Sequence, residues 1–363
     1  MKFLLPLFLI LTICSSAVKS QQISFPDSIY SGPQSSFHVQ GVAVDPLKGF
    51  VYFSFTDRLI KTDLSGKMIG SVTGFVGHLG DLDLSPDGKV YGSLEYKNDA
   101  IGKGIQTKLG ANATDEDGFY VAIFDVAAIV RPNMNAEEEN ILKTVFIKEA
   151  TEDYKAEVTV DGRKEMHRFG CSGIDGIAFA PAIGAKESNK KYLYVAYGIY
   201  GDNKRTDNDQ QVILQYDISD WSKYAKKLSQ RSLHHSGPKK PIKKHFFKTG
   251  NTKYGIQNLA YDSQSGHLLA AVYRGAKPEF PNYDLFAIDT RVKPTKGLIT
   301  GWHFPFGSTG LCPLGDGSFY ISHPAKTKGG RQETTLFKYR WVGNREKSFE
   351  LINSLNLINL QEH

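Results

Sequence analysis

Short apolar segments, rich in β-branched and aromatic residues, recur along the chain and are separated by tight turns. The repeating unit is an apolar segment led by small or polar residues, a turn, a second apolar segment, and a third that ends near an aspartate. In the first copy these segments lie at 38–46, 51–55 and 59–63. Segments of this length and composition, with turns such as Asp87-Gly88 between them, predict β-strands.

The unit occurs five times, because further copies begin near residues 78, 173, 255 and 308. A sheet of three or four strands cannot bury both of its faces alone, whereas five radially stacked sheets bury them and leave few open edges. We therefore predict an all-β fold in which residues 21–363 form a single β-propeller of about five blades around a central channel.

Two other architectures stay open at this stage. Residues 157–169 predict an extra hairpin, and residues 348–352 together with N-terminal residues could close the ring, so six blades are one alternative. A pair of β-sandwiches is the other. Helices are expected only as short segments over 136–143 and 221–229.

Several of these repeats resemble the blades of a known propeller type. The strings GVAVDP, VYFS and RLIKTDLSGK between residues 41 and 67 resemble an NHL or SMP-30/gluconolactonase-type blade, and GHLGDLDLSPDGKVYGS and GIDGIAFAP are similar. Propellers of this type include enzymes, binding modules and scaffolds. The resemblance therefore implies a fold and leaves the activity open.

The first twenty residues predict a secretory signal peptide. Lys2 precedes an apolar run over 3–13 that is too short to span a bilayer, and Val18 and Ser20 stand at the −3 and −1 positions before Gln21. No other stretch is apolar and long enough to cross a membrane. We expect a protein secreted to the extracellular space or the periplasm, with no transmembrane segment.

The charge of the chain is mildly basic. Removing Lys2 and Lys19 with the leader lowers the formal charge from +6 to +4, and much of the excess lies in residues 223–248. We expect that run to be an exposed connector between the third and fourth blades, with contact to an anionic glycan as the alternative. No motif for nucleic-acid binding is present, so we expect no nucleic-acid partner.

Two cysteines, Cys171 and Cys312, remain after removal of the leader. An exported protein could pair them, but they fall in different repeats, two blades apart. We expect two buried free thiols.

Functional residues are expected at one mouth of the channel. In a propeller the starts of the innermost strands and the loops between the second and third strands of each blade gather at one end. Three of those loops are long here, at 97–117, 198–210 and 324–333. Long loops on a rigid scaffold commonly carry function.

Alignment of the repeats places polar residues in columns at this mouth. The candidates for ligand binding are His38, Gln40, Tyr200, Gln257, Asn258 and His323, and the candidates for catalysis are His78, Glu95, Asp175, Tyr197 and Arg274. For each there is a structural alternative. Asp81 and Asp175 could bond backbone amides, the histidines could pack in the core, and Tyr197 and Tyr273 could cap it.

Three functions remain open, and the first is an enzyme acting on a saccharide. A lyase for uronic-acid units needs a cation, a base and an acid. Arg274 would be the cation, His78 or His38 the base, and Tyr197, Tyr200 or Tyr273 the acid. A glycoside hydrolase would use Asp81 or Asp175 with Glu95.

The second function is a metal-dependent lactonase or esterase, which the SMP-30 resemblance implies. Asp81, Asp175 and Asn258, with Glu95, would hold Ca²⁺ or another hard divalent cation. The glutamate that characteristically leads the first blade in that family is absent, because His38-Val39-Gln40 stands there.

The third function is a non-catalytic propeller that binds a glycan or a protein loop at the same mouth. Across the three, we expect a monomer whose partner is a glycan or a small sugar derivative. The expected cofactor is either none or a divalent cation such as Ca²⁺.

Overall fold

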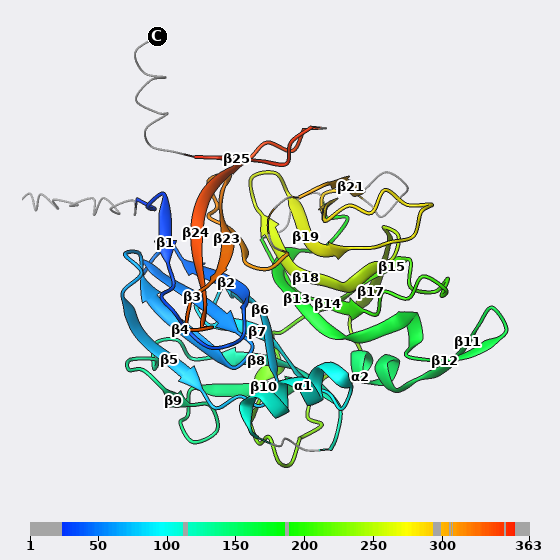
Figure 1. The fold of residues 1–363 in the computed structure, drawn as a ribbon, viewed down its shortest axis with the longest axis horizontal. Helices are drawn as coiled ribbons and strands as arrows, with labels where there is room; N and C mark the ends of the chain where they lie inside the picture. Colours follow the sequence, from blue (N-terminus) through cyan, green and yellow to red (C-terminus); the bar gives the residue numbers. More distant parts are fainter. Residues whose placement is uncertain are drawn as a thin grey trace, which may run out of the picture.

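The protein is a five-bladed β-propeller, which confirms the predicted fold class (Figure 1). A computed structural model describes residues 24–111, 115–185, 189–292, 299–304, 306, 308–344 and 346–352. The resemblance to NHL and SMP-30-type propellers therefore holds at the level of architecture. The predicted leader, residues 1–20, lies outside the described residues.

Each blade is an antiparallel sheet whose strands follow one another from the channel outward. Blade 1 contains β2 (Val39–Asp45), β3 (Phe50–Phe55), β4 (Arg58–Asp63) and β5 (Met68–Thr73), with β9 (Met134–Asn135) added in parallel. Blade 2 contains β6 (His78–Leu84), β7 (Val90–Tyr96), β8 (Gly118–Phe124), β10 (Leu142–Phe146) and β16 (Lys226–Lys227). Blade 3 contains β13 (Cys171–Pro181), β14 (Lys191–Ile199), β15 (Gln210–Tyr216) and β17 (Lys243–Lys248).

The last two blades complete the ring. Blade 4 contains β18 (Thr252–Asp262), β19 (His267–Arg274), β20 (Leu285–Asp289) and β21 (Ile299–Trp302). Blade 5 contains β22 (Leu311–Pro313), β23 (Ser318–Lys326) and β24 (Gln332–Trp341), and its outer edge is formed by β1 (Ser28–Tyr30) and β25 (Phe349–Leu351). In Figure 1 the blue β1 lies beside the orange β24, so the N-terminal segment closes the ring in the fifth blade.

The innermost strands β2, β6, β13, β18 and β22 contact one another in a closed cycle. Every residue of β2 and β7 is buried, because the neighbouring blades cover both faces of each sheet. Five hydrophobic clusters fill the spaces between adjacent blades. This interblade burial explains why the strands are continuously apolar rather than alternating.

Residues 348–352 do not begin a sixth blade, because β25 pairs with β24. The predicted extra hairpin is confirmed: β11 (Glu157–Val160) and β12 (Arg163–Met166) form a separate two-stranded sheet. Among the described residues no helix is long and apolar enough to cross a bilayer.

Of the two segments where short helices were expected, 136–143 has none and 221–229 has only a short 3₁₀ helix. Residues 136–143 connect β9 to β10, and 221–229 contain one 3₁₀ turn, Trp221–Lys223, followed by β16. In the part of the chain that the structure describes, the α-helices are α1 (Ala100–Leu109) and α2 (Lys148–Lys155), and a second 3₁₀ turn spans Arg168–Gly170. The Asp99 carboxylate caps α1 by accepting a bond from the Gly102 amide, so a local cap rather than an apolar stripe starts this helix.

The basic run is not a simple connector, which corrects the prediction for residues 223–248. Its last six residues are β17, the outer strand of blade 3, and Lys226–Lys227 extends blade 2. His245 and Phe247 point into the blade, and most of the lysines of β17 face outward. Likewise, half of 324–333 continues β23 and β24, which leaves a loop of five residues, 327–331.

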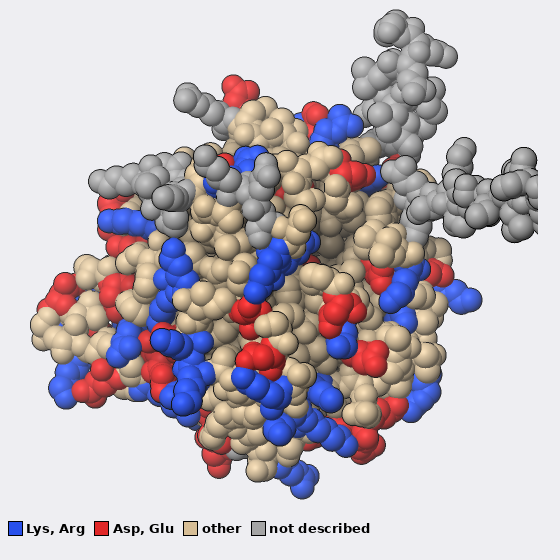
Figure 2. Space-filling view, turned by 180° about the vertical axis from the view of Figure 1, so that it is seen from behind, with Lys and Arg blue, Asp and Glu red and all other residues tan. Residues whose placement is uncertain are grey.

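Two further expectations concern the cysteines and the surface. Cys171 and Cys312 are free and buried, as predicted. Figure 2, the view from behind, shows basic and acidic side chains interspersed over that face.

Candidate active site at the channel mouth

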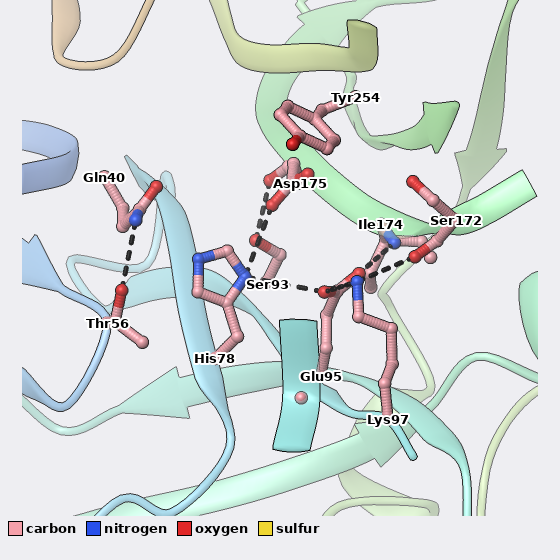
Figure 3. Close-up of polar contacts among 12 residues, drawn as sticks. Gln40, Thr56, His78, Ser93, Glu95, Lys97, Ser172, Ile174, Asp175 and Tyr254 are labelled. Atoms are coloured by element: carbon pink, nitrogen blue, oxygen red, sulfur yellow. Dashed lines mark hydrogen bonds and ion pairs between the residues drawn. The ribbon is translucent and has the colours of Figure 1, made fainter. Parts of the chain in front are cut away.

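Three titratable side chains meet at the mouth between blades 2 and 3 (Figure 3). The antiparallel register pairs His78, the first residue of β6, with Glu95 near the end of β7. The His78 Nδ1 atom lies 3.4 Å from Glu95 Oε2 and 3.6 Å from Asp175 Oδ1 of β13. One ring nitrogen therefore faces two carboxyl groups from neighbouring blades.

The three side chains differ in their access to solvent. The Glu95 side chain is 1% exposed, whereas those of Asp175 and His78 are 11% and 14% exposed. In Figure 3 the second ring nitrogen of His78, Nε2, points away from the carboxyl groups. It has no hydrogen-bond partner in the part of the chain that the structure describes. His78 can therefore exchange a proton with a ligand in the channel, while Glu95 cannot contact one.

A buried lysine balances the charge of Glu95. The Lys97 ammonium lies 2.8 Å from Glu95 Oε2 and donates a 2.8 Å hydrogen bond to the Ser172 carbonyl. Burial opposes the charged form of Lys97, but attraction to Glu95, Asp99 and Asp175 outweighs it and raises the pKa of the ammonium. The site thus contains a compensated ion pair beneath the histidine.

The loop after β7 is fixed to blade 3 through Asp99 and Tyr200. The Tyr200 hydroxyl donates a 2.7 Å hydrogen bond to Asp99 Oδ2. Burial and this bond to the carboxylate raise the pKa of Tyr200, so the phenol stays protonated. Tyr200 therefore anchors the start of α1 beside the mouth, which is a positioning role.

Glu95 fits its pocket only because residue 173 is a glycine. The Ile174 amide donates a 2.5 Å hydrogen bond to Glu95 Oε1. Gly173 has a φ of +124°, and a Cβ atom built there would lie 1.9 Å from the same oxygen. Both the backbone conformation and the space exclude a side chain at this position.

Gly173→Ala should therefore displace the Glu95 carboxylate and release its hold on His78. We expect a loss of stability of roughly 2–4 kcal/mol from steric strain and a broken buried hydrogen bond. Urea unfolding measures this loss. Gly162→Ala, at a turn with open space around the glycine and a positive φ of 77°, is the control for backbone strain alone. If the two variants are equally stable, the fit around Glu95 is not as tight as described.

Asp175 is the acidic group that faces the channel. Its Oδ2 accepts a 3.0 Å hydrogen bond from Gln257, whose amide also donates to the Tyr254 carbonyl at 2.8 Å. Burial, and then the nearby Glu95 charge, raise the pKa of Asp175 to about 7; His78 and Lys97 act in the opposite direction. Asp175 therefore holds a proton for part of the time at neutral pH.

The raised pKa makes stability depend on pH in a defined window. Because the folded state binds this proton more tightly than the unfolded state, the contribution of Asp175 is complete below about pH 4 and is lost as pH rises through about 7. Asp175→Asn should remove that dependence. Urea unfolding should be compared at pH 5, near the lower end of this window, and at pH 8, above it. Between these two pH values, wild type should lose stability relative to the variant. Parallel curves for the two proteins would mean that the pKa is not raised.

The same donor atoms are of the types that bind metals. The ligand atoms of His78, Glu95 and Asp175 all lie within 4.8 Å of one another. However, a cation held by all three would sit beside the Lys97 ammonium, which already neutralises Glu95. This donor set therefore fits proton transfer better than metal binding.

Two of the predicted metal ligands lie deeper in the ring. Asp81 Oδ2 accepts hydrogen bonds from the Ile177 and Leu259 amides at 2.9 and 2.8 Å, and its other oxygen pairs with the Asn258 amide group. Asn258 Oδ1 in turn accepts from the Leu311 amide at 3.2 Å. These two side chains join the inner strands of blades 2, 3, 4 and 5, so the structure places them in the scaffold, apart from the mouth cluster.

Three other predicted residues are held away from the cluster. The Tyr197 hydroxyl donates a 2.6 Å bond to Asp153 in the core between blades 2 and 3. Arg274 pairs with Asp284 at 2.9 Å and is 61% exposed. The His323 ring stacks on Tyr339, with 5.8 Å between ring centroids. None of them contacts Glu95 or Asp175.

Blade 1 supplies two polar groups at the mouth. Gln40 Nε2 lies 3.1 Å from Thr56 Oγ1 and 3.3 Å from His38 Nε2. Burial, followed by the charges of His78 and Lys108, lowers the pKa of His38, which favours its neutral form. His38 and Gln40 can therefore offer hydrogen bonds to a neutral or anionic ligand.

The sequence analysis missed Lys97 and Tyr254. Lys97 follows Glu95 by two residues, so the alternation of β7 places both on one face, and this signal was readable. Tyr254 lies beside Asp175 in Figure 3 and has a φ of 69°, a left-handed conformation that is costly for a tyrosine. No sequence pattern marks that conformation, although the following residue is a glycine.

Comparisons with solved structures give propellers at low similarity. The soluble aldose sugar dehydrogenase of Escherichia coli, in its apo form, is 10% identical, with 85% of this chain and 99% of that chain covered and a TM-score of 0.37. The calcium-binding protein regucalcin of Agrobacterium tumefaciens is 15% identical, with coverage of 90% and 98% and a TM-score of 0.38. A putative gluconolactonase is 11% identical, with coverage of 86% and 93% and a TM-score of 0.33.

No protein-family model and no curated protein matches the chain. At TM-scores this low, the similar structures carry no argument about activity. The fold assignment rests on the five blade sheets of the described chain itself, and the function must be argued from the mouth.

Proposed function

We propose that the mouth is an acid–base active site that hydrolyses a lactone or ester of a small, sugar-derived acid. The observation that carries this proposal is the orientation of His78: Nδ1 faces Glu95 and Asp175, while Nε2 points away from them, toward the side of Gln40 in blade 1, and is unpartnered among the described residues. Carboxyl groups at one ring nitrogen orient the imidazole. The other nitrogen is then available as a general base.

The reaction divides between His78 and Asp175. His78 Nε2 accepts a proton from water as the water oxygen adds to the substrate carbonyl carbon. The carbon–oxygen bond to the alcohol then breaks, and the leaving oxygen takes a proton from Asp175, whose pKa of about 7 suits a general acid. The proton on His78 Nε2 then leaves to solvent, and Asp175 regains its proton from water, so that both groups return to their starting forms.

The two carbohydrate reactions considered from the sequence fit this geometry less well. A glycoside hydrolase needs carboxyl groups on opposite sides of the scissile bond, about 5 Å or more apart. Glu95 and Asp175 instead both face the same nitrogen of His78. A uronic-acid lyase needs a free cation, whereas Lys97 is paired with Glu95 and Arg274 with Asp284.

The substrate class follows from the other groups at the mouth. Gln40 in blade 1 and Gln257 in blade 4 offer amide oxygens, because their amide nitrogens are already bonded, and the Tyr254 ring offers an aromatic face. This combination suits a compact, hydroxyl-rich ring. Secretion through residues 1–20 and a monomeric state remain predictions, and with them we propose that the enzyme acts outside the cytoplasm.

The proposal is tested by a hydrolysis screen of the purified protein against sugar lactones, sugar esters, neutral glycans and uronic-acid polymers. We expect turnover of lactones or esters, without added metal and after treatment with a chelator. Turnover only of the polymers would replace the proposal with a saccharide lyase or hydrolase. Activity lost on chelation and restored by a divalent ion would make His78 a metal ligand. Binding without turnover of any substrate would indicate a binding propeller.

A further inference from the structure

A second cavity lies between blades 2 and 3 at the opposite end of the strands from His78. It has a volume of about 680 Å³ and is lined by the turn after β6, the start of β14 and the segments after β8 and β15. Because β6 separates the two ends by about 20 Å, this interblade groove is distinct from the mouth. Its volume lies within the range of small-molecule sites, about 300–1,000 Å³.

The rim of the interblade groove has an excess of positive charge. Four lysines and three aspartates line it. Lys89 pairs with Asp87 at 3.1 Å, and Lys190 pairs with Asp217 at 2.5 Å. Within the described residues, Lys143 and Lys191 have no ion-pair partner within 4 Å. Asp125 is the third aspartate of the lining, and Lys191 also attracts the nearby buried carboxylate of Asp83.

The floor of the interblade groove is aromatic and contains two unused donors. The rings of Tyr91 and Phe179 pack edge to face, 5.0 Å apart, and Trp221 lies beside them. Tyr91 and Trp221 are only 4% and 2% exposed. Neither the Tyr91 hydroxyl nor the Trp221 indole N–H has a hydrogen-bond partner among the described residues. Donors on almost fully buried residues in a cavity lining favour a ligand that brings acceptors.

From these observations we infer that the interblade groove binds a small amphipathic organic anion. Its flat apolar body would lie against Tyr91, Phe179 and Trp221. Its single acidic group would reach Lys143 and Lys191, and an acceptor atom would meet the Tyr91 hydroxyl. The inference goes beyond the proposed function, because none of these residues belongs to the mouth.

Fluorescence titration with anilinonaphthalene sulfonate, a flat aromatic anion, tests this site on the full protein. Uncharged anilinonaphthalene is the matched probe. We expect one sulfonate to bind per chain. Lys143→Gln and Lys191→Gln should each raise its Kd about fivefold. High salt should also weaken binding. Lys103→Gln, at an exposed lysine of α1, should leave the Kd unchanged.

Two further variants separate the groove from other sources of fluorescence. Tyr91→Phe keeps the ring and removes the hydroxyl, so it should weaken binding while the urea midpoint stays near wild type. His78→Ala should not affect binding, even if the mouth proves inactive. Equal binding of the uncharged probe, or a sulfonate Kd that is indifferent to Lys143 and Lys191, would overturn the inference.

Discussion

Replacing His78 with alanine should reduce turnover of the lactone or ester substrate by at least about 100-fold, because the general base is lost. The fold should persist, since the His78 side chain reaches the mouth and is not part of the hydrophobic clusters between blades. Steady-state kinetics on the substrate found by the screen measures the effect. The reduction should appear in kcat, because the base acts in the chemical step.

A chemical rescue separates a base from a positioning residue. Added imidazole should restore part of the activity of His78→Ala, because a small base can occupy the vacated space beside the channel. His303→Ala removes a 60%-exposed histidine elsewhere and should have wild-type kinetics. Full activity of His78→Ala would end the proposal, and activity lost without imidazole rescue would point to an orienting role.

The second large effect is expected on stability, from Asp81→Ala. This substitution leaves the Ile177 and Leu259 amides and the Asn258 amide group without their acceptor in the centre of the ring. Unsatisfied buried donors cost about 1–3 kcal/mol each, so we expect a loss of roughly 4 kcal/mol. The urea midpoint, compared at constant m-value, measures it.

A conservative variant makes this second prediction sharper. Both backbone amides donate to Asp81 Oδ2, so the amide oxygen of Asp81→Asn can still accept both. Only the pairing with Asn258 is lost, and the cost should be about 1–2 kcal/mol. Asp220→Ala, at an exposed aspartate, should change stability by less than about 0.5 kcal/mol. An Asp81→Ala protein as stable as wild type would show that this network does not hold the blades together.

The difference between Asp81 and Asp175 could not be found in the sequence. Both are aspartates near the start of an inner strand, and alignment of the repeats placed them in adjacent columns. In the ring, Asp81 turns toward the inner strands of blades 3 and 4, whereas Asp175 faces His78 of blade 2. Local bulges in β6 and β13 shift the register at these positions, and bulges leave no clear mark in the pattern.

Composition explains the other errors. The acidic and polar residues of α2 gave no apolar stripe, because its buried side includes Thr151 and Asp153. Lysines dominate the sequence of β17, although His245 and Phe247 at alternate positions are buried. Because of these lysines, the sequence analysis interpreted the segment as an exposed connector. Arg274 ends β19 as expected, but Asp284 from the same blade neutralises it, which only the folded chain could reveal.

The sequence alone determined the repeat, the five-bladed fold and the end of the channel where polar side chains gather. It could do so because strand length, apolar composition and turn chemistry are local properties that recur in every blade. The tertiary structure decided which polar residues meet. His78, Glu95 and Asp175 come from two blades and lie up to 97 positions apart, and their contact depends on ring closure, bulges and the space left by Gly173.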